Sequence, residues 1–424
     1  MAKSHFRIKG AQKALTGTIT VRGAKNGVLK AFAASILFEN PVVIKNVPLI
    51  EDVLRAEELL KYLGVKIERK ARTFILDTRR ITKTKFEKSI VKSMRASIVI
   101  AGPLLAVKKK ASFVHPGGCV IGKRSIDIFL EGWKAMGVRV RKKGDEYDLS
   151  VKTLKACDFT FKKVSVTATE TLMMTAILAN GRTILRNCAC EPEIPHLAEF
   201  LNSCGARISG AGTHTIIIEG TKGKLLNAEK PFKTMPDRIE AGSFAILAAA
   251  IGKRVKIKNC IPEHIAILLK ILEDSGVDIK KGKDYITVSK AERLRSADIK
   301  TREYPGFPTD LQAPFVVLMT QARGTSLIFE TVFDGRLNYV NELNRMGANI
   351  VSCDAHRVLI NGPTELHGRV MESPDIRAGL AFIIAAIIAK GESIIDNTYQ
   401  INRGYENIDV RLRKLGVDIK KEKD

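Results

Sequence analysis

The hydrophobic residues of this chain follow two patterns that recur in turn along its length. Some stretches are apolar on nearly every side, such as 31–38, 244–251 and 379–389, whereas others carry apolar residues three or four positions apart, such as Ile408, Leu412 and Leu415. The first pattern predicts a helix that is covered all round, and the second predicts an outer amphipathic helix. Short apolar segments that follow the buried stretches predict strands.

A glycine ends each amphipathic stretch and is followed by Val or Ala, any residue, and Ile or Val. Six such glycines occur 68 to 73 residues apart: Gly64, Gly137, Gly205, Gly276, Gly347 and Gly416. A helix that ends at a left-handed glycine and leads directly into a strand explains the pattern. Each repeat is therefore predicted to run strand, buried helix, strand, amphipathic helix, strand and strand, in an α/β (α+β) fold.

Polar residues stand at the start of each buried stretch. They are Lys25 with Asn26, Arg95 with Ser97, Thr167 with Thr169 and Glu170, Asp237 with Arg238, Asp310 with Gln312, and Asp375 with Arg377. Any single one is explained equally well as a helix cap. If the repeats pack side by side, however, several helix N-termini converge, and N-termini beside Arg and Lys form an anion site.

The composition describes a folded and strongly basic protein. Hydrophobic residues make up 45% of the chain, and 70 Lys+Arg against 45 Asp+Glu give a net charge of +25. Three explanations of the excess positive charge remain open: solvated turns, a surface that binds nucleic acid, or a site that attracts small polyanions. The longest apolar stretch is too short to cross a bilayer and the amino terminus does not resemble a signal peptide, so we expect a cytoplasmic protein without membrane insertion.

Seven scattered cysteines without a CxxC pair indicate reduced thiols, and Cys188 with Cys190 lacks a second pair of metal ligands, so no metal site is expected. Cys119 differs from the others because it lies in a glycine-rich connector, 115–124 (HPGGCVIGKR). Lys123 and Arg124 and a nearby helix start favour its thiolate. The alternative is a free cysteine in a flexible turn, whereas a general-acid role needs no catalytic triad.

At these residues the sequence resembles the enolpyruvyl transferases, most closely those that act on a nucleotide sugar. The resemblance covers nearly the whole chain, in RGAKNGVLKA (22–31), MRASIVIAGPLLA (94–106), PGGCVIGKRSID (116–127), EPEI (191–194), MPDRIEAG (235–242), FPTDLQA (307–313), ETVFDGR (330–336) and INRGYE (401–406). It implies two similar domains, each an inside-out α/β barrel of three repeats with buried parallel helices. Residues 1–21 with 235–424 would form one domain and residues 22–234 the other, with the active site in the cleft between them.

The reaction implied by the resemblance is transfer of the enolpyruvyl group of phosphoenolpyruvate to the 3′-hydroxyl of UDP-N-acetylglucosamine. Phosphate is released through a tetrahedral intermediate, in the first committed step of peptidoglycan synthesis. By position in the motifs, Cys119 would be the general acid and Asp310 the base near the attacking hydroxyl, with Lys25 as a third catalytic residue. No cofactor is implied.

The substrate-binding residues are likewise implied by the motifs, and guanidinium groups suit the phosphate and carboxylate of phosphoenolpyruvate. For phosphoenolpyruvate they are Lys25, Asn26, Arg95, Arg124, Arg377 and Arg403. For UDP-N-acetylglucosamine they are Arg95, Arg124, Ser125, Ile126, Asp127, Ile128, Lys163, Val164, Ser165, Val166, Asp310 and Val332. The chain departs from the family pattern at Ser125, at Thr167 and in 334–340 (DGRLNYV), and the first two put affinity rather than reaction type in question.

Two alternatives remain. A sister transferase acting on shikimate 3-phosphate would share the fold, but the cysteine loop and 403–406 (RGYE) argue against it. A basic repeat protein that binds nucleic acid would keep the charge, but it has no need for Lys25, Cys119, Asp310 and Arg403 together. We expect small-molecule substrates, no nucleic acid, a monomer rather than an obligate oligomer, and the remaining positive charge on the outer surface.

Overall fold

The computed structural model describes residues 4–117 and 124–423. These described residues divide into two compact units. The terminal unit contains the chain up to Arg22 and again from Pro236 onward, and the residues between them form the inserted unit. The terminal unit is therefore discontinuous in sequence.

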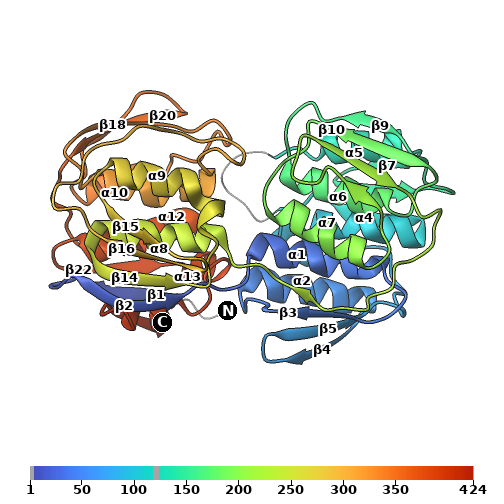
Figure 1. Cartoon of the computed structure of the whole chain (residues 1–424), viewed down its shortest axis with the longest axis horizontal. Helices are drawn as coiled ribbons and strands as arrows, with labels where there is room; N and C mark the ends of the chain where they lie inside the picture. Colours follow the sequence, from blue (N-terminus) through green and yellow to red (C-terminus); the bar gives the residue numbers. More distant parts are fainter. Residues whose placement is uncertain (1–3, 118–123, 424) are drawn as a thin grey trace. The chain divides into compact units, whose positions relative to one another are not determined.

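Small sheets flank the helices of each unit (Figure 1). In the described part of the inserted unit, three sheets have the strand orders β13 (Phe232–Lys233), β3 (Val42–Lys45), β5 (Thr73–Asp77), β4 (Lys66–Lys70); β6 (Lys110–Val114), β8 (Glu146–Ser150), β7 (Arg139–Lys143); and β11 (Ile208–Ser209), β12 (Thr215–Glu219), β10 (Arg182–Arg186), β9 (Asp158–Thr160). The described residues of the terminal unit also form three sheets. The first has the strand order β21 (Val370–Glu372), β22 (Glu392–Asp396), β1 (Ser4–Lys9), β23 (Asp418–Lys423). The second has the order β15 (Asp278–Lys281), β16 (Tyr285–Ser289), β14 (Gly252–Lys258), β2 (Leu15–Thr20), and the third has the order β17 (Ile299–Lys300), β18 (Gly324–Phe329), β20 (Arg357–Gly362), β19 (Ile350–Ser352).

The helices are of the two predicted kinds. The buried ones are α1 (Lys25–Ala34), α4 (Ser97–Lys108) and α6 (Val166–Ala176) in the inserted unit, and α8 (Arg238–Ile251), α10 (Gln312–Met319) and α12 (Ile376–Ile388) in the terminal unit. The outer ones are α2 (Glu51–Leu63), α5 (Asp127–Ala135), α7 (Glu193–Ser203), α9 (Ala266–Asp274), α11 (Val340–Arg345) and α14 (Ile408–Arg413). Shorter pieces are η1 (Ser35–Leu37), α3 (Lys88–Ser93), η2 (Pro262–Ile265), η3 (Thr309–Leu311) and α13 (Thr398–Asn402).

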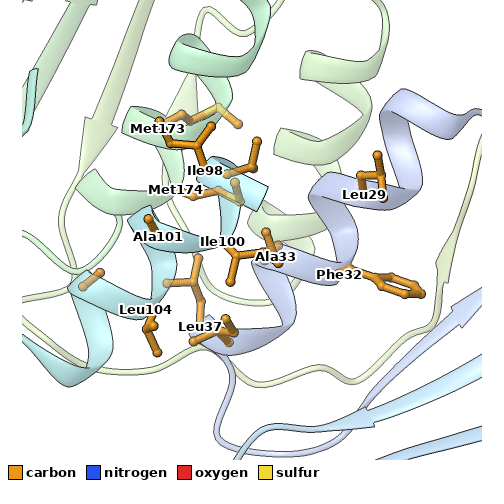
Figure 2. Packing of buried hydrophobic residues seen from close by; sticks show 14 of the residues in the cluster. Leu29, Phe32, Ala33, Leu37, Ile98, Ile100, Ala101, Leu104, Met173 and Met174 are labelled. Carbon is orange, nitrogen blue, oxygen red and sulfur yellow. The ribbon is translucent and has the colours of Figure 1, made fainter. Parts of the chain in front are cut away.

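The buried helices form the centre of each unit. In the inserted unit α4 contacts both α1 and α6, and Figure 2 shows apolar side chains of these three helices directed into their shared interior, among them Ala33, Ile100 and Met174. In α12 every residue from Arg377 to Ile387 is buried. A helix without a polar face must be covered on all sides, so the prediction that these stretches lie inside is confirmed.

The glycines that end the amphipathic helices have the predicted conformation. All six have a positive φ, between 83° and 109°. The following residue donates its backbone N–H to a carbonyl one turn back in the helix, as Val65 does to Leu60 at 3.0 Å and Val417 to Leu412 at 3.3 Å. This is the hydrogen bond expected of a left-handed helix end, and it turns the chain directly into a strand.

The predicted order of elements is found in most repeats, but some strands pair outside their own repeat. β2 precedes α1 in sequence but pairs with β14 of the terminal unit, and β13 precedes α8 but pairs with β3 of the inserted unit, both in parallel. β1 pairs antiparallel with both β22 and β23, and so serves as the last strand of the sixth repeat. A parallel partner need not be close in sequence, so local patterns do not determine these pairings.

Part of the positive charge lies on exposed strands at the edges of the sheets. β4, β7, β15 and β23 each stand at one end of their sheet and are rich in Lys and Arg. All residues of β7 except Val140 are exposed. Charged edge strands discourage pairing with other molecules, which gives this part of the charge a structural role. Among the described residues, no helix combines the length and the apolar character needed to span a membrane.

Candidate active site

Two arginine side chains of the terminal unit form hydrogen bonds with the carboxylate of Asp310. Asp310 lies in η3 just before α10, while Arg377 is the second residue of α12 and Arg336 precedes α11. Arg377 donates from Nη2 to Oδ2 of Asp310 at 2.8 Å, and Arg336 donates from Nη2 to Oδ1 at 2.8 Å. The two arginine side chains are 7% and 3% exposed and the aspartate 27%, so both pairs are largely desolvated.

The two guanidinium groups control the ionisation of Asp310. Burial alone would raise the pKa of this carboxyl, but attraction by Arg377 and then by Arg336 outweighs burial and holds the pKa well below its usual range. Asp310 is therefore ionised and accepts hydrogen bonds. A carboxylate held by two cations is a weak base, so its basicity rises only if one of these contacts is broken.

A buried tyrosine, Tyr405, contacts the other terminal nitrogen of the Arg377 guanidinium group. Arg377 donates from Nη1 to the hydroxyl of Tyr405 at 3.0 Å, and that hydroxyl lies 3.2 Å from Oγ of Ser243 in α8. Side chains from η3, from the first turn of α12 and from the second turn of α8 are thus linked through Arg377 and Tyr405. The predicted convergence of helix starts is observed here.

Helix capping, the simpler explanation of the polar helix starts, is correct for several of them. Asp237 accepts from the backbone N–H groups of Ile239 and Glu240, and Asp375 accepts from those of Arg377 and Ala378. These carboxylates occupy the donors that an anion would use. The anion site predicted at these two helix ends must therefore depend on side chains instead.

The inserted unit differs at two of its buried helices. α1 follows Ala24 and α4 follows Ala96, and alanine has no side-chain acceptor with which to cap a helix. Lys25 and Arg95 stand at these two starts, so cationic side chains adjoin the positive ends of the helix dipoles. In α6, by contrast, the side chain of Ser165 caps the helix by accepting from the N–H of Ala168.

Each cation at these helix starts contacts acceptors of the chain itself. Nζ of Lys25 lies 2.7 Å from Oδ2 of the buried Asp52 in α2. Arg95 donates to the carbonyl of Ser125 at 2.8 Å and to that of Pro116 at 3.4 Å, and so holds both ends of the connector that carries Cys119. Cys119 itself lies outside the described residues.

The remaining predicted nucleotide-sugar residues differ in accessibility. Ser125, Asp127 and Lys163 are exposed, and Arg124, Ile128, Val164, Ser165, Val166 and Val332 are partly exposed. Ile126 is 1% exposed, so its side chain belongs to the core and only its backbone is available for a ligand. The N–H of Val332 donates to Glu330, whose other oxygen accepts from Thr309 beside Asp310.

Arg403 and Asn26 complete the predicted phosphoenolpyruvate residues. Arg403 follows α13, is mostly buried, and donates from Nη1 to Oε1 of Gln400 at 3.0 Å. Asn26 is partly exposed in the first turn of α1, next to Lys25.

Glu170 was expected at the start of a buried helix, but it lies within α6 and serves the core. Its Oε2 is 2.9 Å from Nζ of Lys30 in α1, and both side chains are buried. Burial raises the pKa of Glu170 to about 7, against the lowering effect of Lys30. Thr169 accepts from the N–H of Ala189 and is buried as well. The prediction that places these two residues on an anion-binding face is therefore wrong.

Sequence reasoning assigned no role to Asp52, Arg336 or Tyr405. The last two lie inside the motifs ETVFDGR and INRGYE, and these motifs are the sequence signal that points to them. Within residues 4–117 and 124–423, no group of three or more His, Cys, Asp or Glu side chains is arranged to hold a metal ion.

The whole chain resembles known enolpyruvyl transferases. The family model described as EPSP synthase (3-phosphoshikimate 1-carboxyvinyltransferase) matches residues 9–412, and the chain belongs to this family. Relatives named UDP-N-acetylglucosamine 1-carboxyvinyltransferase include one from Koribacter versatilis, 40% identical over 98% of this chain and 96% of its own, and one from Desulforapulum autotrophicum, 41% identical over 99% of each.

Solved structures match over the full length. The enolpyruvyl transferase NikO from Streptomyces tendae has a TM-score of 0.90 at 21% identity and covers 100% of each chain. EPSP synthase from Acinetobacter baumannii has a TM-score of 0.75 at 17% identity, over 99% of this chain and 100% of its own. At these identities the structures establish the fold alone, and the predicted mixed α/β enolpyruvyl transferase fold is confirmed.

Proposed function

We infer that this chain transfers the enolpyruvyl group of phosphoenolpyruvate to the 3′-hydroxyl of UDP-N-acetylglucosamine and releases phosphate. The observation that carries this function is the full-length similarity, at about 40% identity, to relatives that bear the name of this activity. The quoted motifs and the cluster around Asp310 support it. The reaction supplies peptidoglycan synthesis.

We propose the following roles for the side chains. Asp310 accepts the proton of the 3′-hydroxyl as its oxygen bonds to the central carbon of phosphoenolpyruvate, while Cys119 delivers a proton to the methylene carbon. In the tetrahedral intermediate, the Cys119 thiolate then takes back a proton from the methyl group while the carbon–oxygen bond to phosphate breaks, which restores the double bond and releases phosphate. Because Asp310 is held by two cations, its contact with at least one of them must weaken when it acts as the base.

We propose further that cations from both units bind phosphoenolpyruvate. Lys25, Arg95 and Arg124 belong to the inserted unit, and Arg377 and Arg403 to the terminal unit. Two uncapped helix starts favour the inserted unit as the binder of the more highly charged phosphate.

We also propose that the protein is a cytoplasmic monomer. The free cysteines among the described residues are consistent with a reducing compartment.

A phosphate-release assay tests the proposed function. Phosphoenolpyruvate is supplied with UDP-N-acetylglucosamine or with shikimate 3-phosphate, and release is expected with the nucleotide sugar only. The Asp310→Asn variant should lose the activity, whereas Asp354→Asn, which alters an exposed carboxylate paired with Arg357, should keep it. Release with shikimate 3-phosphate alone would favour the sister activity. Retention on DNA that weakens with salt, without phosphate release, would favour a nucleic-acid-binding protein.

A further inference from the structure

Tyr405 is fully buried in the terminal unit, inside the INRGYE motif, and its hydroxyl has two polar partners. Arg377 Nη1 lies 3.0 Å from the hydroxyl oxygen and Ser243 Oγ lies 3.2 Å from it. A buried hydroxyl needs such partners, since leaving it without them costs free energy. The ring alone would fill the same space, so the contacts of the hydroxyl set tyrosine apart from phenylalanine at this position.

The donors and acceptors of this cluster can be assigned by elimination. Ser243 Oγ donates its proton to the carbonyl of Ile239 at 2.7 Å. The hydroxyl of Tyr405 must therefore donate to Ser243, and its oxygen is left to accept from Arg377, which has donors only. Ser243 thus orients the tyrosine hydroxyl so that its acceptor side faces the guanidinium group.

The two contacts of Arg377 lie at different ends of one planar group. Nη1 is held by Tyr405 and Nη2 by Asp310. A long arginine side chain has many rotamers, and contacts at both nitrogens select one of them and fix the plane of the fork. If Asp310 leaves Nη2 during the reaction, the contact with Tyr405 is the one that keeps the guanidinium in place.

Gly404 allows the loop that carries Tyr405 to approach α12 closely. A Cβ atom at this position would lie 2.5 Å from Cγ2 of Ile376 and 3.6 Å from Nη1 of Arg377. The first distance is a clash, so a side chain here would push the loop away from the helix. The same loop carries Arg403, another of the proposed phosphoenolpyruvate ligands.

We propose that Tyr405 is a positioning residue that presents the guanidinium group of Arg377, through its Nη2 end, first to Asp310 and then to the anionic substrate. The role rests on the proposed function, in which Arg377 binds phosphoenolpyruvate. Tyr405 itself does not touch substrate. When Asp310 breaks its contact with Nη2 to accept the proton of the sugar hydroxyl, the hydrogen bond between Nη1 and Tyr405 keeps the guanidinium group in place.

The test compares Tyr405→Phe with Tyr339→Phe. Tyr339 is another buried tyrosine of the same unit, and its hydroxyl donates to Oε1 of Gln312 at 3.2 Å. Both variants lose one buried hydroxyl, so a general effect on stability is matched. For Tyr405→Phe we expect KM for phosphoenolpyruvate to rise by about 10- to 100-fold, the range for a lost hydrogen bond to a charged group. KM for UDP-N-acetylglucosamine should change less than about twofold, and Tyr339→Phe should leave both KM values close to wild type.

A second variant keeps the proposal testable if Tyr405→Phe does not fold. Ser243→Ala leaves the tyrosine in place but frees its hydroxyl to rotate, so a smaller rise in KM for phosphoenolpyruvate is expected. Equal KM values in Tyr405→Phe and Tyr339→Phe, or an unchanged KM in Ser243→Ala when Tyr405→Phe cannot be purified, would overturn the proposal. Absence of phosphate release by the wild-type protein would instead overturn the proposed function.

Discussion

The ammonium group of Lys25 lies 2.7 Å from the carboxylate of Asp52, and both side chains are largely excluded from solvent. Lys25 begins α1 and Asp52 lies in the first turn of α2. Arg377 and Asp310 form a similar pair in the terminal unit. In both units, a cation proposed to bind phosphoenolpyruvate is thus held by a carboxylate of the chain.

Replacing Asp52 tests whether this carboxylate positions Lys25. In Asp52→Asn the charge attraction that orients the ammonium group is lost, so kcat/KM for phosphoenolpyruvate should fall by about tenfold or more. Steady-state phosphate release measures the change. Glu58→Gln is the control, because Glu58 pairs with Arg55 on the exposed side of the same helix. Equal kinetics in the two variants would show that Asp52 does not act through Lys25.

Removing one cation from Asp310 should shift the pH dependence of the reaction. In the wild type the pKa of Asp310 is held well below its usual range, so a base at this position stays ionised throughout pH 5 to 8. In Arg336→Gln the pKa should rise, and activity should fall on the acidic side, where the carboxylate takes up a proton. The profile of kcat/KM for the nucleotide sugar against pH checks this. Arg357→Gln, which leaves Asp354 without its exposed partner, should keep the wild-type profile.

An epoxide of the fosfomycin type should alkylate Cys119 selectively. Burial raises the pKa of Cys157 and Cys260 to about 11 and that of Cys188 to about 12, which keeps these thiols protonated and unreactive. Intact-mass analysis after incubation with UDP-N-acetylglucosamine should show one adduct and loss of activity.

Two cysteine variants control for the site of alkylation. Cys119→Ser should show no adduct, and Cys353→Ser, which removes an exposed thiol, should still be modified. An adduct that survives in Cys119→Ser would contradict the assignment.

The buried pair of Lys30 and Glu170 should make stability depend on pH in a defined direction. Lys30→Met leaves a carboxylate buried without its cation, which costs about 3–5 kcal/mol when that carboxylate is charged. Burial already raises the pKa of Glu170 from 4.5 to about 7, so folding favours the protonated form. The loss should therefore be small near pH 5 and grow as pH rises through 7.

Urea unfolding at pH 5 and pH 8 measures this effect. The double variant with Lys30→Met and Glu170→Leu should recover most of the stability at pH 8, since no charge is then buried. The same loss at both pH values in Lys30→Met would mean that Glu170 is not the group that titrates.

The local features of the fold were predictable because they depend on residues close together in the chain. The six glycines predict helix ends, and all six have positive φ, since the required conformation favours a residue without Cβ. The pairing of β2 with β14 and of β13 with β3 does not follow from local patterns, because a parallel edge accepts a strand from any distance along the chain. Only the family resemblance, which groups residues 1–21 with 235–424, implies where these strands belong.

In the candidate active site, too, some features follow from the local sequence and others only from the tertiary structure. Polar residues at buried helix starts mark Lys25, Asp310 and Arg377 in the sequence, because such residues are rare in otherwise apolar stretches. That Asp237 and Asp375 cap their helices while Asp310 binds two arginines follows only from side-chain geometry.

By itself, therefore, the sequence determined the repeat, its buried helices, its helix ends and the family to which the chain belongs. Tertiary structure alone decided which strands pair and which carboxylate holds which cation. Asp310 contacts Arg377, and Arg377 contacts Tyr405, because the starts of α10 and α12 and the segment between α13 and α14 pack together in one unit. Contacts of that kind depend on packing between distant segments, and no local pattern of residues encodes them.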